Sequence, residues 1–153
     1  MASRPALDPA TVPERTGSAY PEKFQARVGG RGKRALGNEV GLTHFGVNLT
    51  RLEPGAWSAL RHWHTREDEF VYVLEGELTL VTDAGEQTLG PGMAAGFPAG
   101  VADGHHLVNR SSRTALYLEV GDRSPEDEVD YPDDDLSIAR RDGFFRHKSG
   151  ERY

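Results

Sequence analysis

The residues of this chain whose types and spacing best suit chemistry are His62, His64 and Glu69. Two histidines separated by one residue cannot share a helix face, because neighbours on a helix surface lie three or four residues apart. They can share the face of a β-strand, where residues i and i+2 point to the same side. Imidazole pairs arranged in this way suit a divalent metal ion. We therefore predict a metal-binding pair on a strand.

Glu69 has the opposite parity to the two histidines, so an unbroken strand would turn its carboxylate to the other face. The polar run from Thr65 to Asp68 lets the chain turn, and a second strand that begins at Glu69 brings the carboxylate back to the same interior. Glu67 is the alternative, since both glutamates have the same strand parity. We favour Glu69 because it directly precedes the apolar run 70–74. We expect Glu67 and Asp68 to be turn residues that face water.

The segments that must position these residues have the pattern of short β-strands. Phe45, Val47 and Leu49 alternate with small or polar residues, and 70–74 is a continuous apolar run, as expected of a strand covered on both faces. Gly76 is expected at a hairpin turn. Further strands are predicted over 78–81, 105–109, 114–120 and 136–141, and a short helix over 21–28. Short strands at such spacing favour an all-β antiparallel sandwich or barrel.

Composition excludes several classes of function. A chain of 153 residues has room for one domain with a substantial core. Its net charge of −6 disfavours binding along a nucleic-acid backbone. The absence of cysteine excludes disulfides, thiolate metal sites and a cysteine nucleophile. No apolar run approaches the length of a membrane span or of a secretion signal, so we expect a cytoplasmic protein without nucleic-acid or membrane partners.

The two ends of the chain differ from its strand-rich middle. Residues 1–20 are predicted to form a flexible arm, because they have too little apolar surface to offset the entropy of ordering. Residues 21–153 are predicted to form a single domain, with a core over about 43–122 and a C-terminal extension over 123–153. The acidic segment 122–135 is expected to be a solvated loop, since its spacing does not match a calcium-binding loop. The basic residues Arg27, Arg31, Lys33 and Arg34 are likewise expected to be solvated surface charge rather than an anion site.

Two motifs resemble those of the cupins, a superfamily of small antiparallel β-barrels. The first comprises Gly55, His62, His64, Glu69 and Gly76, and the second comprises Gly92, Pro98, Gly100, His105 and Asn109. Six residues separate Gly55 from His62 where the family pattern has five, and four separate Gly100 from His105 where it has two. The segments Tyr20–Pro21, Leu42–Asn48 and Tyr131–Asp133 are also similar to those of single-domain bacterial cupins.

The resemblance implies a fold, a metal site and an assembly. The fold would be a cupin-type antiparallel β-barrel of two sheets, jelly-roll-like, with short irregular N- and C-terminal extensions. The metal ligands would be His62, His64, Glu69 and His105, holding one divalent transition metal ion (iron, manganese, nickel, copper or zinc). Strand alternation would turn His106, the alternative to His105, away from the metal. A homodimer is also implied, in which Phe70, Tyr72 and Leu74 face away from the metal and pack on the second sheet or on a neighbouring subunit.

These features favour a metal-dependent enzyme that acts on a small polar organic substrate. Three neutral imidazoles and one carboxylate leave coordination positions open for substrate oxygens, which suits an isomerase, an epimerase or an oxygenase. No general acid or base beyond the ligands is evident, so catalytic residues stay unassigned. The alternative is a non-catalytic module that binds a small ligand or a sugar. A purely structural barrel is disfavoured, because burying four ligand-type residues without a metal or complete hydrogen bonding is costly. Trp57 and Trp63 are expected to pack rather than to stack on a ligand.

Overall fold

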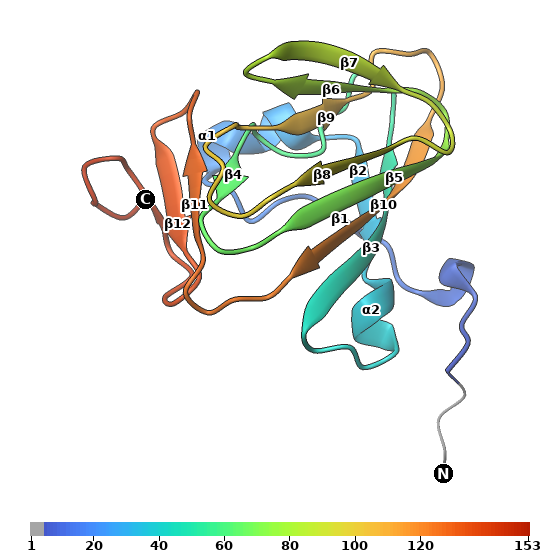
Figure 1. The fold of residues 1–153 in the computed structure, drawn as a ribbon, viewed down its shortest axis with the longest axis horizontal. Coiled ribbons are helices and arrows are strands. Elements are labelled where there is room, and N and C mark those ends of the chain that lie inside the picture. Colours follow the sequence, from blue (N-terminus) through green and yellow to red (C-terminus); the bar gives the residue numbers. More distant parts are fainter. Residues whose placement is uncertain (1–4) are drawn as a thin grey trace.

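The computed structural model describes residues 5–153 as a β-stranded fold with a few short helical turns (Figure 1). In chain order the strands are β1 (Arg15–Thr16), β2 (Arg31–Arg34), β3 (Phe45–Leu52), β4 (Trp63–His64), β5 (Glu69–Glu75), β6 (Leu78–Thr82), β7 (Gly85–Leu89), β8 (Ala94–Phe97), β9 (His106–Val108), β10 (Ala115–Asp122), β11 (Glu128–Tyr131), β12 (Leu136–Ala139) and β13 (Phe145–Arg146). The helical turns are η1 (Pro9–Thr11), α1 (Glu22–Gln25), η2 (Ala26–Val28) and α2 (Leu36–Glu39). No helix within residues 5–153 is long and apolar enough to cross a membrane.

The strands form antiparallel sheets, which confirms the predicted fold class. The largest sheet has six strands in the order β1-β2-β3-β10-β5-β8. A four-stranded sheet has the order β13-β12-β11-β4, and a three-stranded sheet has the order β7-β6-β9. Figure 1 shows the three-stranded sheet above the large one, with β11 and β12 to one side. The fold is therefore a sandwich of separate sheets rather than one closed barrel.

The large sheet has an inner face toward the other sheets and an outer face away from them. Residues paired directly across antiparallel strands project to the same side. Glu69 thus shares the inner face with Gly121 of β10, which also pairs with Gly46 of β3. Phe70 and Tyr72 alternate with these residues and are 45% and 39% exposed. The run 70–74, predicted to be covered on both faces, is covered on one face only in the single chain.

Two apolar clusters hold the sheets together. The first fills the space between the large sheet and the three-stranded sheet and includes Leu52, Val73, Leu78, Leu107 and Tyr117. The second includes Tyr20, Phe24, Val28, Leu60 and Leu136, and it packs the helical turns α1 and η2 against β11 and β12. Burying a large aliphatic or aromatic side chain stabilises a fold by about 1.5–3 kcal/mol. The second cluster therefore holds the four-stranded sheet against the helical turns near the N-terminus and against Leu60.

Gly76 lies in the turn between β5 and β6, and its conformation requires glycine. The predicted hairpin is wrong, because β5 pairs with β10 and β8 while β6 pairs with β7 and β9 in another sheet. Its φ of 79° lies in the left-handed region that other residues rarely adopt. A Cβ at this position would also lie 2.9 Å from the Cα of Ala115. The turn thereby packs directly against Ala115, the first residue of β10.

The ends of the chain pack on the sandwich. In the N-terminal segment Arg15 pairs with Lys33 and Val12 is buried, while residues 1–4 of the predicted arm lie outside the described residues. The division of the chain at residue 20 stays a prediction. The expectation of a solvated acidic loop over 122–135 is wrong at Asp127, which is 1% exposed, and in β11, where Val129 and Tyr131 are buried. Alternate apolar residues turn this part of the segment into a strand that pairs with β4 and β12.

Candidate metal centre

The candidate metal centre lies where β4, β5 and the start of β9 meet. His64 is the last residue of β4, Glu69 is the first residue of β5, and His105 immediately precedes β9. His62 and His105 form an isolated antiparallel bridge through their backbones. The turn between β4 and β5 reverses the chain, as the polar run 65–68 indicated. It brings the Glu69 carboxylate to the same interior as the histidine rings.

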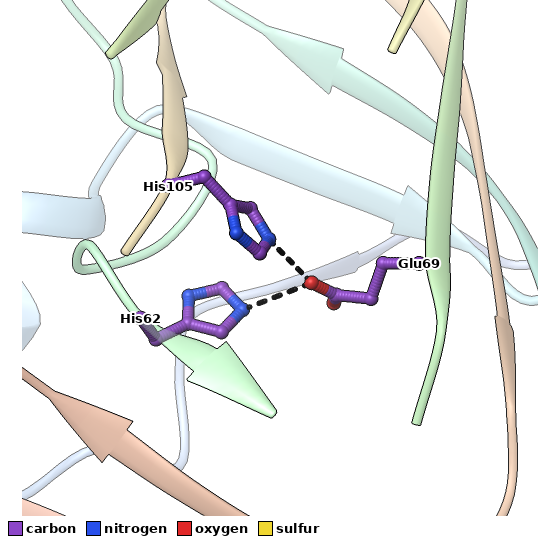
Figure 2. Close-up of side chains that lie close together, drawn as sticks. All are labelled: His62, Glu69 and His105. Carbon is purple, nitrogen blue, oxygen red and sulfur yellow. Dashed lines mark hydrogen bonds and ion pairs between the residues drawn. The ribbon is translucent and has the colours of Figure 1, made fainter. Parts of the chain in front are cut away.

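The three histidine rings converge on that carboxylate. His105 Nε2 lies 2.5 Å and His62 Nε2 lies 3.5 Å from Glu69 Oε2 (Figure 2). His64 Nε2 lies 3.1 Å from the other oxygen, Oε1. In Figure 2 the rings of His62 and His105 approach the carboxylate from the side opposite to β5. The structure therefore brings together all four side chains of the predicted ligand set, which we call the metal group: His62, His64, Glu69 and His105.

The far side of two of the three rings is held by a hydrogen bond, whereas the buried His105 Nδ1 has no partner within the described residues. His62 Nδ1 donates to the Leu60 carbonyl at 2.8 Å, and His64 Nδ1 donates to Asp127 Oδ2 at 2.7 Å. These bonds place a proton on Nδ1 and so make Nε2, which faces Glu69, the ring nitrogen available to a metal ion. His105 is held by stacking on Phe97, with ring centroids 3.6 Å apart and planes 3° from parallel.

The charges in the metal group perturb each other's pKa. Burial alone would raise the pKa of Glu69, but hydrogen bonds from His105, His62 and His64 outweigh it and hold that pKa well below its usual value. Burial would lower the pKa of His64, yet the bonds and charges of Glu69 and Asp127 raise it to about 9. Burial lowers the pKa of His105. Without a metal ion, the group therefore carries an ionised glutamate beside an imidazolium at neutral pH.

This donor set fits a divalent transition metal ion. Three imidazole nitrogens and a carboxylate are the ligands that such ions take from proteins. Ligand atoms of His62, Glu69 and His105 all lie within 4.8 Å of one another, as a shared ion requires. Two of the rings also have the hydrogen bond at the outer nitrogen that metal-bound histidines usually make.

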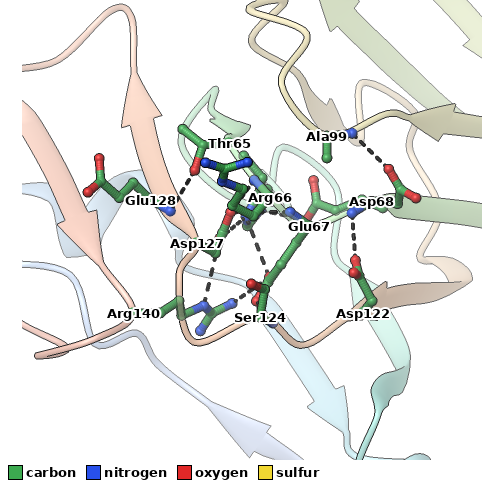
Figure 3. Close-up of polar contacts among 12 residues, drawn as sticks. Thr65, Arg66, Glu67, Asp68, Ala99, Asp122, Ser124, Asp127, Glu128 and Arg140 are labelled. Carbon is green, nitrogen blue, oxygen red and sulfur yellow. Dashed lines mark hydrogen bonds and ion pairs between the residues drawn. The ribbon is translucent and has the colours of Figure 1, made fainter.

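A second group of carboxylates lies behind His64 and was not predicted from the sequence. We call Glu67, Asp127 and Arg140 the Asp127 network (Figure 3). Asp127 Oδ1 accepts hydrogen bonds from the backbone amides of Arg66 and Glu67, at 2.9 Å and 3.2 Å. These bonds hold the turn that presents Glu69. The C-terminal extension thus supports the metal group from outside the two motifs.

Glu67 does not face water, contrary to the prediction. Its side chain is buried, where it accepts from the Ser124 amide at 3.0 Å and from Arg140 at 3.1 Å. Asp68 is exposed, as expected, but it also ties two loops together. Its amide donates to Asp122 at 2.6 Å and its carboxylate accepts from the Ala99 amide at 2.8 Å (Figure 3).

His106 takes no part in the metal group. Its Nδ1 donates to the Ala59 carbonyl at 2.9 Å, and its ring lies edge-to-face on Trp57, with centroids 4.7 Å apart. Trp57 packs against the second apolar cluster, in line with the packing role predicted for it.

The metal group opens onto a cavity of about 570 Å³, a volume suited to a small organic molecule. The wall across the inner face of the large sheet is polar, although inner faces of sandwiches are usually apolar. It carries side chains of the following residues: Arg15, Arg31, Lys33, Asn48 and Glu119. The expectation of solvated surface charge is therefore wrong for Arg31 and Lys33, which line this cavity. Glu69 has Gly121 of β10 on one side and Phe97 of β8 on the other, and the Arg123 guanidinium lies beside Gly46.

Comparison with known proteins agrees with the fold and the motifs. The family model described as a cupin domain matches residues 48–121. The chain is similar to the solved structure of a sugar phosphate isomerase from a cupin superfamily of Silicibacter pomeroyi. Identity is 46% over 97% of this chain and 96% of that chain, and the TM-score is 0.92.

Two further solved structures are similar over 80% of this chain and 80% of their own chains. One is a candidate sugar phosphate isomerase from Acidithiobacillus ferrooxidans, at 34% identity and a TM-score of 0.72. The other is the polyketide cyclase RemF from Streptomyces resistomycificus, at 26% identity and a TM-score of 0.61. The search of curated proteins finds no significant match. Motifs, sandwich fold and near full-length similarity to a solved cupin agree, and the chain belongs to the cupin superfamily.

Proposed function

We propose that the protein is a metal-dependent enzyme that isomerises a small polyhydroxylated substrate of the sugar phosphate class. The observation that carries the proposal is the convergence of His62, His64 and His105 on Glu69 at the wall of a polar cavity of about 570 Å³. The similarity at 46% identity to a protein named as a sugar phosphate isomerase supports this reaction class over an oxygenase.

In this proposal the metal group holds one divalent ion, iron, manganese, nickel, copper or zinc. Such an ion would supply Lewis acidity toward neighbouring carbonyl and hydroxyl oxygens of the substrate. Asp127 keeps the His64 ring in one tautomer through its bond to Nδ1. Gly121, directly across from Glu69 on β10, adds no side chain to the cavity beside the carboxylate.

Isomerisation also needs a group that moves a proton, and Glu119 is our candidate. Its carboxylate lies on the inner wall of the cavity, one alternation along β10 from Gly121. Lys33 Nζ lies 2.5 Å from Glu119 Oε1 and holds the carboxylate in place on this wall. We assign proton transfer between adjacent substrate carbons to this carboxylate.

One observation favours the alternative, a non-catalytic module that binds a small ligand or a sugar. Glu119 Oε1 also accepts from the Thr50 hydroxyl at 3.2 Å and the Asn48 amide at 3.3 Å, so this oxygen is bonded within the protein and Oε2 is the one left for a ligand. A carboxylate satisfied in this way is better suited to binding than to proton transfer.

The two functions are separated by turnover at a measured metal content. Protein purified without a histidine tag would be analysed for metals and incubated with aldose and ketose phosphates in deuterated water, with products followed by NMR. The enzyme proposal predicts about one ion per chain, deuterium incorporation at the carbon beside the carbonyl, and loss of both incorporation and turnover in Glu119→Gln at unchanged metal content. Ligand binding without exchange or turnover in every metal form would establish the binding module.

We also propose that the outer face of the large sheet forms a homodimer interface. Phe70, Tyr72 and Leu74 are 45%, 39% and 38% exposed there, side by side on one strand. Exposed apolar side chains grouped in this way are typical of interaction surfaces. Sedimentation of the wild type should give twice the chain mass, and Tyr72→Glu should reduce it to one chain mass. A monomeric wild type at high concentration would contradict the proposal.

A further inference from the structure

Arg31 is a partly buried cation whose side-chain contacts are neutral. Nη1 donates to the Ser58 carbonyl at 2.5 Å and Nη2 donates to the Gly17 carbonyl at 3.2 Å. A guanidinium has five N–H donors, so these bonds leave others available. Across residues 5–153, no carboxylate comes within 4.0 Å of its nitrogens. A cation removed from water without a counter-charge is costly, and the cavity beside it is where an anion can supply that charge.

Two further cations stand on the same wall. Arg15 of β1 pairs with Lys33 of β2, and Lys33 pairs with Thr50 of β3, so their side chains project to the same face as Arg31. All three cations line the cavity of the metal group. Lys33 pairs with one carboxylate, Glu119 of β10, so three cations face a single acidic side chain and this wall is net positive. This is notable in a chain whose total charge is −6.

Tyr117 adds a neutral donor on this side of the cavity. The residue is fully buried, and its hydroxyl lies near the side chains of Thr50 and Ser58 but makes no hydrogen bond of good geometry within the described part of the chain. Burial raises the pKa of Tyr117 well above its usual value, so the hydroxyl keeps its proton at any working pH. A buried hydroxyl without a partner costs free energy that a ligand oxygen would recover.

We propose that the wall formed by Arg15, Arg31, Lys33 and Tyr117 is a subsite for a phosphate monoester, at the end of the ligand remote from the metal group. Arg31 supplies the guanidinium fork that matches phosphate oxygens, and Lys33 and Arg15 add charge. The assignment rests on the proposed function for the other end of the ligand. The three cations lie on β1 and β2, which precede the part of the chain that matches the cupin domain model, residues 48–121, whereas Tyr117 lies within that part.

The first test uses wild-type protein and a pair of probes that differ only in the phosphate. Metal-loaded protein is titrated with glucose 6-phosphate and with glucose by calorimetry, and metal-stripped protein is titrated with inorganic phosphate. The subsite predicts that glucose 6-phosphate binds at least tenfold more tightly than glucose, and that inorganic phosphate binds the stripped protein. Equal affinity for the two probes, or no phosphate binding, overturns it.

The second test compares two arginines of β2. Arg31→Gln removes the cation that lines the cavity. Arg34→Gln is the matched control, since Arg34 also donates to two backbone carbonyls, those of Ala10 and Val12, but does not line the cavity. Arg31→Gln should weaken binding of inorganic phosphate and glucose 6-phosphate at least tenfold and leave glucose unaffected, while Arg34→Gln should match the wild type. Equal weakening in both variants, or none in Arg31→Gln, contradicts the subsite. Arg31→Lys keeps the charge but not the guanidinium fork, so its affinity for phosphate should lie between those of Arg31→Gln and the wild type. It replaces Arg31→Gln in the test if that variant does not fold.

Metal content is measured in every variant, which separates this proposal from the proposed function. If the protein takes up no metal but still binds phosphate in a way that depends on Arg31, the subsite is supported and the proposed metal-dependent reaction is contradicted. If the protein takes up one ion per chain but does not prefer the phosphorylated probe, the subsite is contradicted and the proposed metal centre is unaffected.

Discussion

The metal group and the Asp127 network are built from the same kinds of side chain, yet they are suited to different tasks. In the Asp127 network the carboxylate oxygens accept from N–H donors: backbone amides, the Arg140 guanidinium and His64 Nδ1. In the metal group, Glu69 instead faces the inner nitrogens of three imidazole rings. His64 belongs to both, with Nδ1 toward Asp127 and Nε2 toward Glu69. Residue type alone does not distinguish a metal site from a scaffold; the remaining hydrogen-bonding capacity does.

The largest effect is expected when a carboxylate of the metal group is neutralised. Glu69→Gln removes the anionic ligand, and the amide that replaces it is a poor ligand for a transition metal. We expect metal affinity to fall by more than about 100-fold, beyond the 10–100-fold typical of residues that only support a ligand. Elemental analysis and metal titration of the purified protein measure this directly.

Glu67→Gln is the matched control, two residues away on the same turn. Because Glu67 accepts from Ser124 and Arg140 and belongs to the scaffold, this variant should retain about one ion per chain. Equal loss of metal from the two glutamine variants would show that the two groups do not have separate tasks.

The next effect tests how far Asp127 supports both groups. Asp127→Ala leaves three donors without an acceptor: His64 Nδ1 and the amides of Arg66 and Glu67. Buried donors left unpaired cost about 1–3 kcal/mol each, so we expect a loss of roughly 3 kcal/mol in the free energy of unfolding. Metal affinity should fall about 10–100-fold, because the His64 ring is no longer oriented.

Chemical denaturation and metal titration of Asp127→Ala give the two quantities. Asp130→Asn is the control from the same segment. Its carboxylate bonds the exposed Lys148, and exposed ion pairs contribute about 0–1 kcal/mol. A wild-type metal affinity in Asp127→Ala would show that His64 needs no support from the C-terminal extension.

A smaller effect, on pH dependence, separates the two nitrogens of His64. In the metal-free protein the pKa of His64 is raised to about 9, against 6.5 for an unperturbed histidine. The folded state therefore binds the proton more tightly than the unfolded state does. The resulting stability is fully present below pH 6.5 and is lost as pH rises through about 9. We expect a decrease on the order of 2 kcal/mol across that window, measured by urea denaturation.

The decrease should disappear in protein loaded with metal, where the ion takes the place of the Nε2 proton. It should also shrink in Glu69→Gln, in which one of the two carboxylates that raise this pKa is neutral. A metal-free protein that grows more stable between pH 6.5 and 9 would contradict the charge arrangement described for the metal group.

Three members of the metal group, His62, His64 and Glu69, were predictable from the residues because their determinants are local. His105 lies 36 positions from Glu69 and was implied by the resemblance to the cupin motifs. Strand parity places His62 and His64 on one face, and the polar turn returns Glu69 to them within a few residues. The Asp127 network was not, because Asp127 lies 63 positions from His64 within a run of acidic residues that favours a solvated loop. The alternation of Val129 and Tyr131 directly after it was the signal for a strand. Parity was also the missed signal in β2, where Arg31 and Lys33 face the cavity and Arg34 faces away.

The smallest effect is expected at Arg140, which tests whether the Asp127 network needs its cation. The Arg140 side chain is 52% exposed, so water screens its pairing with Glu67, and Glu67 keeps the bond from the Ser124 amide without it. Arg140→Gln should therefore lower the free energy of unfolding by about 0.5–1 kcal/mol and leave metal content at one ion per chain. Thermal melts at low and high salt provide the measurement, since the difference from wild type should shrink as salt screens the pair. If Arg140→Gln instead gained a second ion at His64, Glu67 and Asp127, the guanidinium would be what keeps this network from binding metal, and charge rather than amide donors would separate the two groups.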